Sequence, residues 1–389
     1  MANETHKNKS KAQSRRRSNR RTTAKKAQAK SSRQKTGGQK AKRGKAQTVA
    51  NTAAPKIKRP ASPVKRTLPK IKVTNIPRYF NIGLGGSGSG GRMDQHWRFK
   101  EIIPYFEGFR TGSKMPHSFR YYDHRFLMDH FKLKGWEFGN WTTEEDRLNY
   151  VCATGISLYD IWKVTGFPKE AVGQFGKLGV AIGARGNGRG IAHYEPGTGI
   201  INMTRYKRYG NAGSALKVPD MSNKKLRSFL QTGGVGAFAH EYGHSLDYFF
   251  GGYVEKDKVI YALSRGRSLS TVIDQSLAKQ DSLRGLTEKL MSVMMWEKDG
   301  NTQTEFYKGL KRVAASNGTY WIRRNEMFAR AFEQWVQLKM AKKKAHNHFL
   351  HQPKYQTAAY MKPDMLKRVV PVMDKLIAKM RQQAKTIKA

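Results

Sequence analysis

The sequence predicts an α+β protein, and two patterns indicate this fold class. Three short apolar runs are separated by glycine-rich turns, which is typical of short strands, and they span residues 178–182, 190–194 and 200–204. Stretches with apolar residues at helical spacing lie on both sides of these runs, at residues 143–166, 236–252 and 325–338. We therefore expect a small antiparallel sheet packed on the helix of residues 236–252, with further helices around it and a helical C-terminus.

The first 72 residues are expected to form a disordered basic tail. The chain of 389 residues has 74 Lys and Arg against 28 Asp and Glu, which gives a net charge of +46. Residues 1–72 hold 24 of these basic residues and one acidic residue, Glu4, and they contain no Phe, Trp or Tyr. Such a segment cannot bury enough apolar surface to offset its chain entropy. Its charge predicts non-specific nucleic-acid binding through phosphate contacts, with an acidic membrane surface or a merely solubilising tail as the alternatives.

Residues 73–131 are expected to form a linker and a lead-in segment. Gly and Ser dominate residues 81–93, and no GK[ST] sequence follows that would make them a phosphate-binding loop. Residues 94–135 alternate aromatic and basic side chains, which predicts packing against the next domain, with a nucleic-acid-binding face as the alternative. That domain is expected to span residues 132–345, and residues 346–389 are expected to form a basic loop and an amphipathic helix.

Several helices and one turn can be assigned within residues 132–345 and 346–389. Residues 143–166 begin with acidic side chains and predict one helix, and residues 166–176 predict a break followed by a short helix. The glycine-rich residues 183–190 fit neither the dinucleotide nor the P-loop spacing, so we interpret them as a turn. The last helix is predicted to pack through one apolar stripe and to expose lysines on its other face; the stripe consists of Leu366, Val369, Met373, Leu376, Ile377 and Met380.

The predicted helix of residues 236–252 carries the motif HExxH, formed by His240, Glu241 and His244. Four residues along an α-helix return about 40° past a full turn, so both imidazoles lie on one face and can bind one metal ion. Zinc suits such a site, because it accepts imidazole nitrogen and lowers the pKa of a bound water to roughly 7. Glu241 would then accept the proton of that water, which is the chemistry of a metallopeptidase. The alternative is a pair of histidines that only fill a core helix.

A zinc site needs a third protein ligand, and the helix of residues 325–338 offers the best candidate, Glu326, near its start. Asp247 follows His240 by seven residues and lies on the same helix face, so it could bind the metal or orient His244 as a hydrogen-bond acceptor. Glu333 is the third candidate, and a salt bridge to Arg330 is its alternative role.

Five segments in order resemble the first large polyvalent-protein-associated domain, a zincin-like domain of phage and conjugative-element proteins. The segments are WEFGNWTTEEDR, LGVAIGARGNGRGIAHYEP, IINMTR, GAFAHEYGHSLDYFFGG and NEMFARAFEQWV, and the resemblance covers about residues 132–340. It implies a gluzincin-type fold, with a small sheet over the HExxH helix and Glu326 as the third ligand. It also implies a protein that travels with DNA into a recipient cell and cuts host defence or regulatory proteins there. This chain departs from the long multidomain pattern of such proteins, because it is short and carries a basic tail.

In zincins, an edge strand before the active helix can hold the substrate as an added strand. His193 and Tyr194 are therefore expected to line the substrate cleft, and Tyr194 either assists the oxyanion or is purely structural. His346, His348 and His351 have no cysteine or acidic partner nearby in the sequence, so they are expected in a solvated loop.

The sequence thus predicts a zinc-dependent peptidase that acts on a protein or peptide, tethered to nucleic acid by its tail. A non-catalytic DNA-binding or internal virion protein on a zincin scaffold is the main alternative, and a regulatory protease acting on a DNA-bound repressor is a weaker one. Cys152 is the only cysteine, which favours a reducing compartment. No signal-peptide core and no stretch of roughly 18 apolar residues is present, so we expect a virion or cytoplasmic protein without a membrane span. The sequence predicts no particular oligomeric state.

Overall fold

The structure is a computed structural model of the chain. It describes residues 110–139, 142, 144–185, 190–204, 234–255, 261–352, 355 and 357–387. The predicted basic tail of residues 1–72 and the Gly/Ser linker of residues 81–93 lie outside the described residues. Within the described part no helix is long and apolar enough to cross a membrane.

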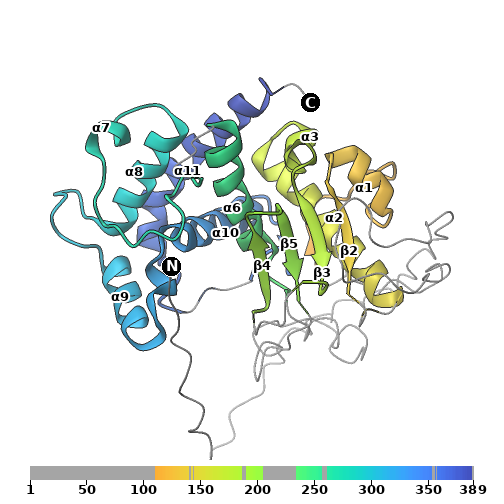
Figure 1. Cartoon of the computed structure of the whole chain (residues 1–389), viewed down its shortest axis with the longest axis horizontal. Helices are drawn as coiled ribbons and strands as arrows, with labels where there is room; N and C mark the ends of the chain where they lie inside the picture. The colour runs from red at the N-terminus through yellow and green to blue at the C-terminus, as the bar shows by residue number, and fades with distance from the viewer. Residues whose placement is uncertain are drawn as a thin grey trace, which may run out of the picture. The chain divides into compact units, whose positions relative to one another are not determined.

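The described residues form an α+β structure with a helical C-terminus, as predicted (Figure 1). The helices are α1 (His124–Phe131), α2 (Glu144–Thr165), α3 (Lys169–Val172), α6 (Phe238–Tyr248), α7 (Gln275–Ala278), α8 (Leu283–Met295), α9 (Glu305–Asn317), α10 (Arg324–Lys342) and α11 (Pro363–Ala384), with shorter helical turns η1 (Gln174–Gly176), η2 (Phe249–Val254) and η3 (Thr319–Ile322). The strands are β1 (Arg110–Thr111), β2 (Gly135–Phe138), β3 (Gly179–Ile182), β4 (Ala192–Glu195), β5 (Ile200–Met203) and β6 (His346–Asn347).

The main sheet has the strand order β2-β3-β5-β4 and is mixed. Strands β2, β3 and β5 run parallel, and only β4 pairs antiparallel, with β5. The prediction of an antiparallel sheet is therefore wrong, although all three predicted strands exist. The reason is topological: β5 leaves the tight turn after β4 and inserts between β4 and β3, so it runs in the direction of β3. Strand β2 joins through the long crossover that contains α2, and such a connection gives parallel neighbours.

One face of the sheet packs on α6, which lies beside β4 and β5 in Figure 1. Side chains at alternating positions of the strands point into this core, among them Trp136, Val180 and Ile201. The opposite face carries an ion network in which Arg185 contacts Glu137 at 2.7 Å and Glu195 at 3.0 Å. The alternation thus separates an apolar face, which meets the HExxH helix, from a charged one.

Helix α6 lies directly against α10, and Gly243 allows their close approach. A Cβ atom at Gly243 would lie 3.1 Å from Ala329 Cα and 3.2 Å from Phe332 Cβ, which is tighter than ordinary van der Waals contact. The absence of a side chain at this position of HExxH therefore permits tight packing of the two helices. It also brings the first turn of α10 next to the two histidines.

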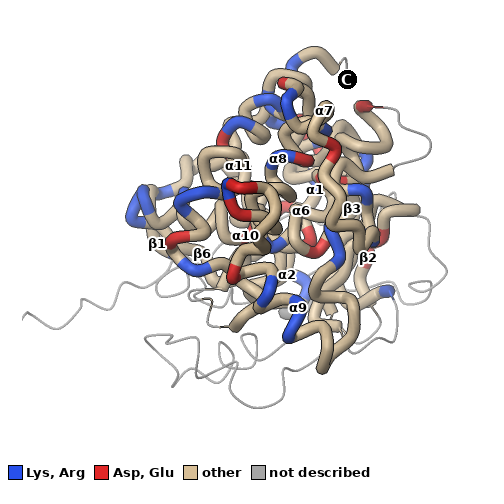
Figure 2. The backbone as a smooth tube through the Cα atoms, turned by 90° about the vertical axis from the view of Figure 1, so that its left-hand side faces the viewer, with Lys and Arg blue, Asp and Glu red and all other residues tan. Residues whose placement is uncertain are grey.

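The lead-in and the C-terminal helix belong to the same core as the sheet and α6. Phe119, Leu127 and Phe131 are buried in it, which agrees with the prediction that the lead-in packs on the following domain. Helix α11 packs on α8 through the predicted apolar stripe, of which Leu366 alone is only partly buried. Figure 2 shows Lys and Arg positions interspersed with Asp and Glu positions over the described part. Residues 1–72 contribute 23 of the 46 net positive charges (24 basic residues minus one acidic residue), so half of the excess lies in less than a fifth of the chain.

Candidate metal centre

Helix α6 presents both histidines of the HExxH motif on one face, as its periodicity requires. The two imidazole rings have their centroids 4.9 Å apart and are nearly perpendicular to each other, at 85°. The helix has no side-chain N-cap. Instead, the backbone N–H groups of Gly236 and Ala239 donate to the carbonyls of Phe349 and Leu350, at 3.0 and 2.8 Å. A segment more than 100 residues later in the chain thus completes the start of this helix.

Glu326, in the first turn of α10, points its carboxylate at both histidines. Nε2 of His240 lies 3.3 Å from Oε2 of Glu326, and Nε2 of His244 lies 3.4 Å from Oε1. One ligand atom from each of the three residues lies within 4.8 Å of the other two. All three side chains are largely shielded from solvent, with exposures of 13%, 8% and 7%.

The donor set of this cluster suits a zinc ion. Two imidazole nitrogens and a carboxylate are a common set of zinc ligands in catalytic sites. Ligand atoms bound to zinc at about 2.0–2.1 Å lie roughly 3.3 Å apart at tetrahedral angles. The 3.3 and 3.4 Å contacts have this length but run to different oxygens of Glu326, and the three ligand atoms lie within 4.8 Å of one another. The chemistry of the three residues therefore fits zinc.

Glu333 lies two turns beyond Glu326 and faces the other nitrogen of His240. Its Oε2 is 3.5 Å from His240 Nδ1, and its two oxygens accept hydrogen bonds of 2.9 Å from the hydroxyls of Tyr355 and Tyr360. Burial alone would lower the pKa of His240, but its interactions with the carboxylates of Glu326 and Glu333 raise it to about 10. Glu333 thus lies behind His240, at the place where a carboxylate orients a metal-binding histidine in other proteins.

The alternative partner expected for Glu333 is wrong. Arg330 points away from Glu333 to Trp321, to whose backbone carbonyl it donates a hydrogen bond, and its guanidinium lies 5.7 Å from the Trp321 ring centroid. Arg330 and Glu333 lie three residues apart on α10 and could pair, but Glu333 is instead held by Tyr355, Tyr360 and His240.

Asp247 is fully buried but is not part of the three-residue cluster. Its oxygens accept hydrogen bonds from the backbone N–H and the hydroxyl of Ser264, at 2.8 and 2.5 Å. Burial raises the pKa of Asp247 to about 6, against the lowering effect of these hydrogen bonds. These contacts connect the loop at Ser264 to α6. Nδ1 of His244, for which Asp247 was a candidate acceptor, is buried with no hydrogen-bond partner in the described part of the chain.

Glu241 lies between the two histidines in sequence and is buried, with 6% exposure. Burial raises its pKa, while the neighbouring imidazoles of His240 and His244 act in the opposite direction. A carboxylate with a raised pKa near a metal ion is suited to accept a proton at neutral pH. Glu326 behaves differently: burial opposes its ionisation, but the charges and hydrogen bonds of both histidines hold its pKa well below the usual range.

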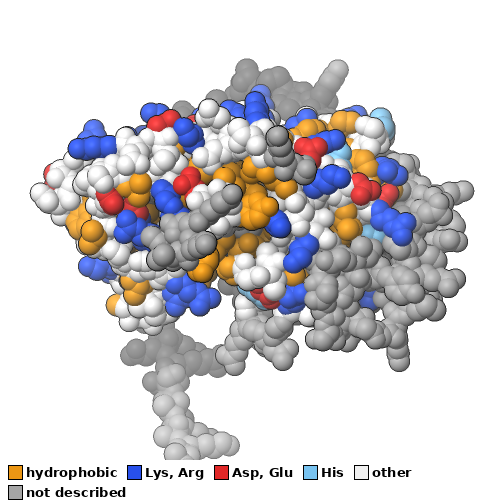
Figure 3. All heavy atoms as spheres, turned by 45° about the horizontal axis from the view of Figure 1, so that its top comes forward, with side chains coloured by type: hydrophobic (Ala, Val, Ile, Leu, Met, Phe, Trp, Pro, Cys, Tyr) orange, Lys and Arg blue, Asp and Glu red, His pale blue; other side chains and the backbone are white. Residues whose placement is uncertain are grey.

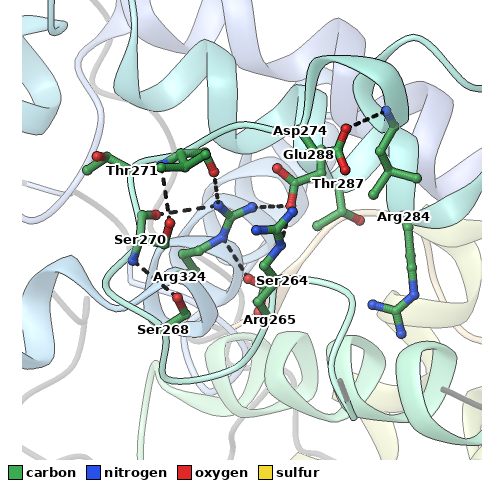
Figure 4. A network of polar contacts seen from close by, with 12 residues as sticks. Ser264, Arg265, Ser268, Ser270, Thr271, Asp274, Arg284, Thr287, Glu288 and Arg324 are labelled. Atoms are coloured by element: carbon green, nitrogen blue, oxygen red, sulfur yellow. Dashed lines mark hydrogen bonds and ion pairs between the residues drawn. The ribbon is translucent and has the colours of Figure 1, made fainter. Parts of the chain in front are cut away.

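Arg324 fixes the start of α10 and thereby the position of Glu326, two residues later. Its side chain is fully buried and donates to Glu288 at 2.5 Å and to the carbonyl of Ser264 at 2.8 Å. Figure 4 shows this guanidinium among the residues of the Ser264–Thr271 loop, with Arg265 also reaching Glu288. The same loop is held by Asp247, so α6 and α10 are joined on both sides of the candidate site.

Strand β4 carries His193 and Tyr194, and it is the edge strand of the main sheet in the described residues. His193 points to the charged face, where its Nε2 lies 3.3 Å from Glu195. Tyr194 points to the α6 face, and its ring centroid is 6.0 Å from that of Tyr248. Because successive residues of a strand point to opposite faces, only Tyr194 faces the side of the sheet on which α6 lies.

Tyr320, in η3, is a site residue that the sequence reasoning missed. Its side chain is 41% exposed, and its phenol lies close enough to Glu326 that burial and the charge of this carboxylate raise the pKa of Tyr320 well above the ordinary value. No motif marks Tyr320, because it reaches the site only through the turn before α10. A phenol at this place can donate to an oxygen of a bound ligand.

The expectation of a solvated loop at His346, His348 and His351 is wrong. His348 and His351 are buried, with 6% and 2% exposure. Burial lowers the pKa of His348 to about 4, and the neighbouring histidines add to this effect. The physical reason is the contact described above: this segment supplies the carbonyls that complete the start of α6, so it must lie inside the molecule.

Comparison with known proteins finds one match. Residues 313–384 match the family large polyvalent protein-associated domain 1, and no curated protein and no solved structure matches the chain. The matched region lies further toward the C-terminus than the expected resemblance over residues 132–340, and it spans the end of α9, η3, α10 and α11. It contains Glu326 and Glu333 but not the HExxH helix. Residues 313–384 are therefore similar to the large polyvalent protein-associated domain 1 family that the sequence analysis named, and of the five motifs given there only NEMFARAFEQWV lies within the match.

Proposed function

We propose that this protein is a zinc-dependent peptidase of phage or mobile-element origin with a zincin-like fold. The observation that carries the proposal is the convergence of His240, His244 and Glu326 from two helices, with 3.3 and 3.4 Å between the imidazole nitrogens and the carboxylate oxygens. An HExxH helix, an edge strand beside it and a glutamate from a later helix are the parts that a gluzincin-type site requires. The polyvalent-protein domain at residues 313–384 supports the association with phages and mobile elements.

In this proposal His240, His244 and Glu326 hold the zinc ion, and Glu333 orients His240. When bound, zinc supplies a positive charge that polarises a peptide carbonyl and acidifies water. Glu241 accepts the proton of the attacking water and delivers it to the leaving amine, for which its raised pKa is suited. Tyr320 turns its hydroxyl from Glu326 to the oxyanion and stabilises the charge that develops there.

The basic tail gives the proposal its second part. Residues 1–72 hold the protein on nucleic acid through non-specific phosphate contacts, so that it is delivered or packaged with DNA. Deletion of residues 1–72 should abolish binding to a random-sequence DNA duplex at 50 mM salt, and binding by the whole chain should weaken steeply at 200 mM. Binding that is retained after the deletion would show that the tail is not the tether.

The peptidase is tested by metal content and by cleavage of a fluorogenic peptide library. The purified chain should hold about one zinc ion, the His240→Ala variant should lose it, and Glu241→Gln should keep the zinc but lose cleavage. Glu305→Gln, at an exposed glutamate outside the site, is the matched control and should cleave normally.

The charge of residues 1–72 also favours a second function, a DNA-binding or internal virion protein in which the same fold is a non-catalytic scaffold. This function predicts that Glu241→Gln leaves the biological activity intact, whereas deletion of residues 1–72 removes it. Full biological activity of the Glu241→Gln variant would therefore reject the peptidase and support the scaffold.

A further inference from the structure

We infer that the cavity at the C-terminal end of α6 is a substrate subsite that selects a large aromatic or apolar side chain and an acidic one two residues further along the peptide. The inference rests on the proposed peptidase function and names its substrate class. The cavity has a volume of about 660 Å³, which lies in the range of ligand-binding pockets. Its walls come from three places: the turn between β4 and β5, the end of α6 with η2, and residues 174–177.

The cavity adjoins the candidate metal centre through Tyr248. Tyr248 lines the cavity and follows His244 by four residues, so it lies about 40° from that histidine around the helix, one turn further along. The charge of Glu326 contributes to raising the pKa of Tyr248, which places the phenol within electrostatic reach of the centre. The three candidate ligands do not themselves line the cavity. It is therefore a neighbouring pocket and not the metal site itself.

The edge strand leads from the centre to the cavity. Tyr194 lines the cavity from β4, and Pro196–Gly199 line it from the turn in which β4 ends. A peptide that pairs with this edge projects every second side chain to the face on which α6 lies. A side chain near the end of β4 thus enters the cavity while the peptide bond one or two residues away lies at the centre.

Five of the lining residues are aromatic, and among the described residues that line the cavity the charged side chains are two lysines. Tyr253 and Tyr261 are 48% and 65% exposed there, so their rings are accessible to a ligand. Figure 3 shows hydrophobic side chains gathered near the centre of one face of the molecule, with Lys and Arg side chains beside them. The aromatic walls of the cavity favour an apolar or aromatic side chain in it.

The two lysines are Lys134 and Lys177. The ammonium of Lys177 lies 5.0 Å from the centroid of the Tyr253 ring, and that of Lys134 donates to the carbonyl of Thr198 at 2.9 Å. Neither lysine has an acidic partner among the residues that line the cavity. Both ammonium groups thus line the cavity without a paired carboxylate in its walls, and they favour a carboxylate two residues from the apolar side chain in the substrate, on the same face of an added strand.

The test uses binding, so that it does not depend on turnover. Zinc-loaded full-length Glu241→Gln protein is titrated by calorimetry with the probe N-acetyl-Phe-Ala-Asp-amide and with the analogues that carry Ala in place of Phe or Lys in place of Asp. The three peptides are called Phe-Asp, Ala-Asp and Phe-Lys after their first and third residues. We expect Phe-Asp to bind roughly 10-fold more tightly than Ala-Asp. The advantage over Phe-Lys should be smaller, roughly 3-fold, because exposed ion pairs contribute little.

Gly197→Leu fills the cavity with little strain, since a Cβ atom at Gly197 meets nothing within 4 Å. This change should abolish the preference for Phe while the zinc content and the melting temperature stay unchanged. Lys177→Glu should reverse the preference between Phe-Asp and Phe-Lys, whereas Lys367→Glu, at an exposed lysine on α11, should leave it as it is.

Two outcomes would overturn the subsite: equal binding of Phe-Asp and Ala-Asp, or an unchanged preference in Gly197→Leu. A separate outcome concerns the peptidase alone. If the preference holds and responds to Gly197→Leu but the wild-type chain cleaves no peptide, the subsite stands as a peptide-binding pocket and the proposed peptidase fails.

Discussion

Replacement of Glu333 by glutamine tests whether this buried carboxylate supports a metal ligand. Glutamine keeps the shape of the side chain but removes the negative charge that lies 3.5 Å from His240 Nδ1. Glu333 is 1% exposed, so water cannot take over this role. We therefore expect Glu333→Gln to weaken zinc binding through His240 without removing any ligand atom.

The size of the effect follows from the contacts of Glu333. Loss of the partner behind a metal-binding histidine typically costs 10- to 100-fold in metal affinity, which corresponds to about 1.4–2.8 kcal/mol. The glutamine amide can accept a hydrogen bond from only one of Tyr355 and Tyr360, which both donate to Glu333 now. A further destabilisation of the fold by about 1–3 kcal/mol is expected from the hydroxyl that loses its acceptor.

The two effects are separated by measuring both quantities on full-length protein. Zinc affinity is obtained by competition with a chelator at fixed pH, and stability by urea unfolding with chelator in excess. Tyr355→Phe keeps the Glu333 charge and removes one hydrogen bond, so it should lose stability but much less zinc affinity. The exposed Glu305→Gln should change neither. A zinc affinity of Glu333→Gln within twofold of wild type would refute the assigned role of Glu333.

Three further predictions concern the frame around the site. Gly243→Ala places a Cβ 3.1 Å from Ala329 Cα, so it should force α6 and α10 apart and lower the free energy of unfolding by about 1–3 kcal/mol. The urea midpoint measures this loss, and an unchanged midpoint would show that the two helices accommodate the extra methyl group without cost. Arg324→Met leaves the buried carboxylate of Glu288 without its strongest partner and should destabilise by about 3–5 kcal/mol, whereas a loss below 1 kcal/mol would contradict the described contacts. The pKa of His348 is about 4 in the folded chain against 6.5 for a free histidine. The free energy of unfolding therefore contains the full effect of the neutral His348 above pH 6.5, and it falls by about 3 kcal/mol as the pH falls from 6.5 toward 4. Stability of His348→Asn, measured at pH 7 and pH 4.5, should fall less on acidification than that of the wild type, and equal falls would argue against the lowered pKa.

The elements that the sequence predicts well are those with a strong local pattern. Residues 143–166, 325–338 and the apolar stripe after Leu366 all form helices, because their apolar spacing matches the period that burial against one side demands. Strand β2 is too short for such a pattern to be counted, since in its four residues only Trp136, Glu137 and Phe138 alternate between apolar and polar side chains. The parallel pairing of β3 with β5 could not be predicted from the sequence either. The direction of a strand relative to its neighbours depends on the position in the sheet at which the chain inserts it, and the residues of the strand do not determine that position.

The same distinction separates the site residues that sequence reasoning found from those that it missed. The histidine pair is fixed by the helical period alone, and Glu326 follows from its place in the first turn of a helix. The role of Glu333 depends on how α10 rotates against α6, which Gly243 and its neighbours decide. Tyr320 and Tyr355 reach the site from turns outside the long helices, so no spacing rule selects them.

The charges of the site give an independent reason to expect a cation there. Three carboxylates, those of Glu241, Glu326 and Glu333, are buried around two imidazoles. Buried anions are costly unless positive charge compensates them, and protons on the imidazoles or a divalent ion are the two sources within the cluster. The raised pKa of His240, about 10, expresses this demand for positive charge. A zinc ion that binds to the nitrogens of His240 and His244 must displace such protons, so zinc binding should release protons and strengthen as the pH rises, and a titration in two buffers of different ionisation enthalpy would measure their number.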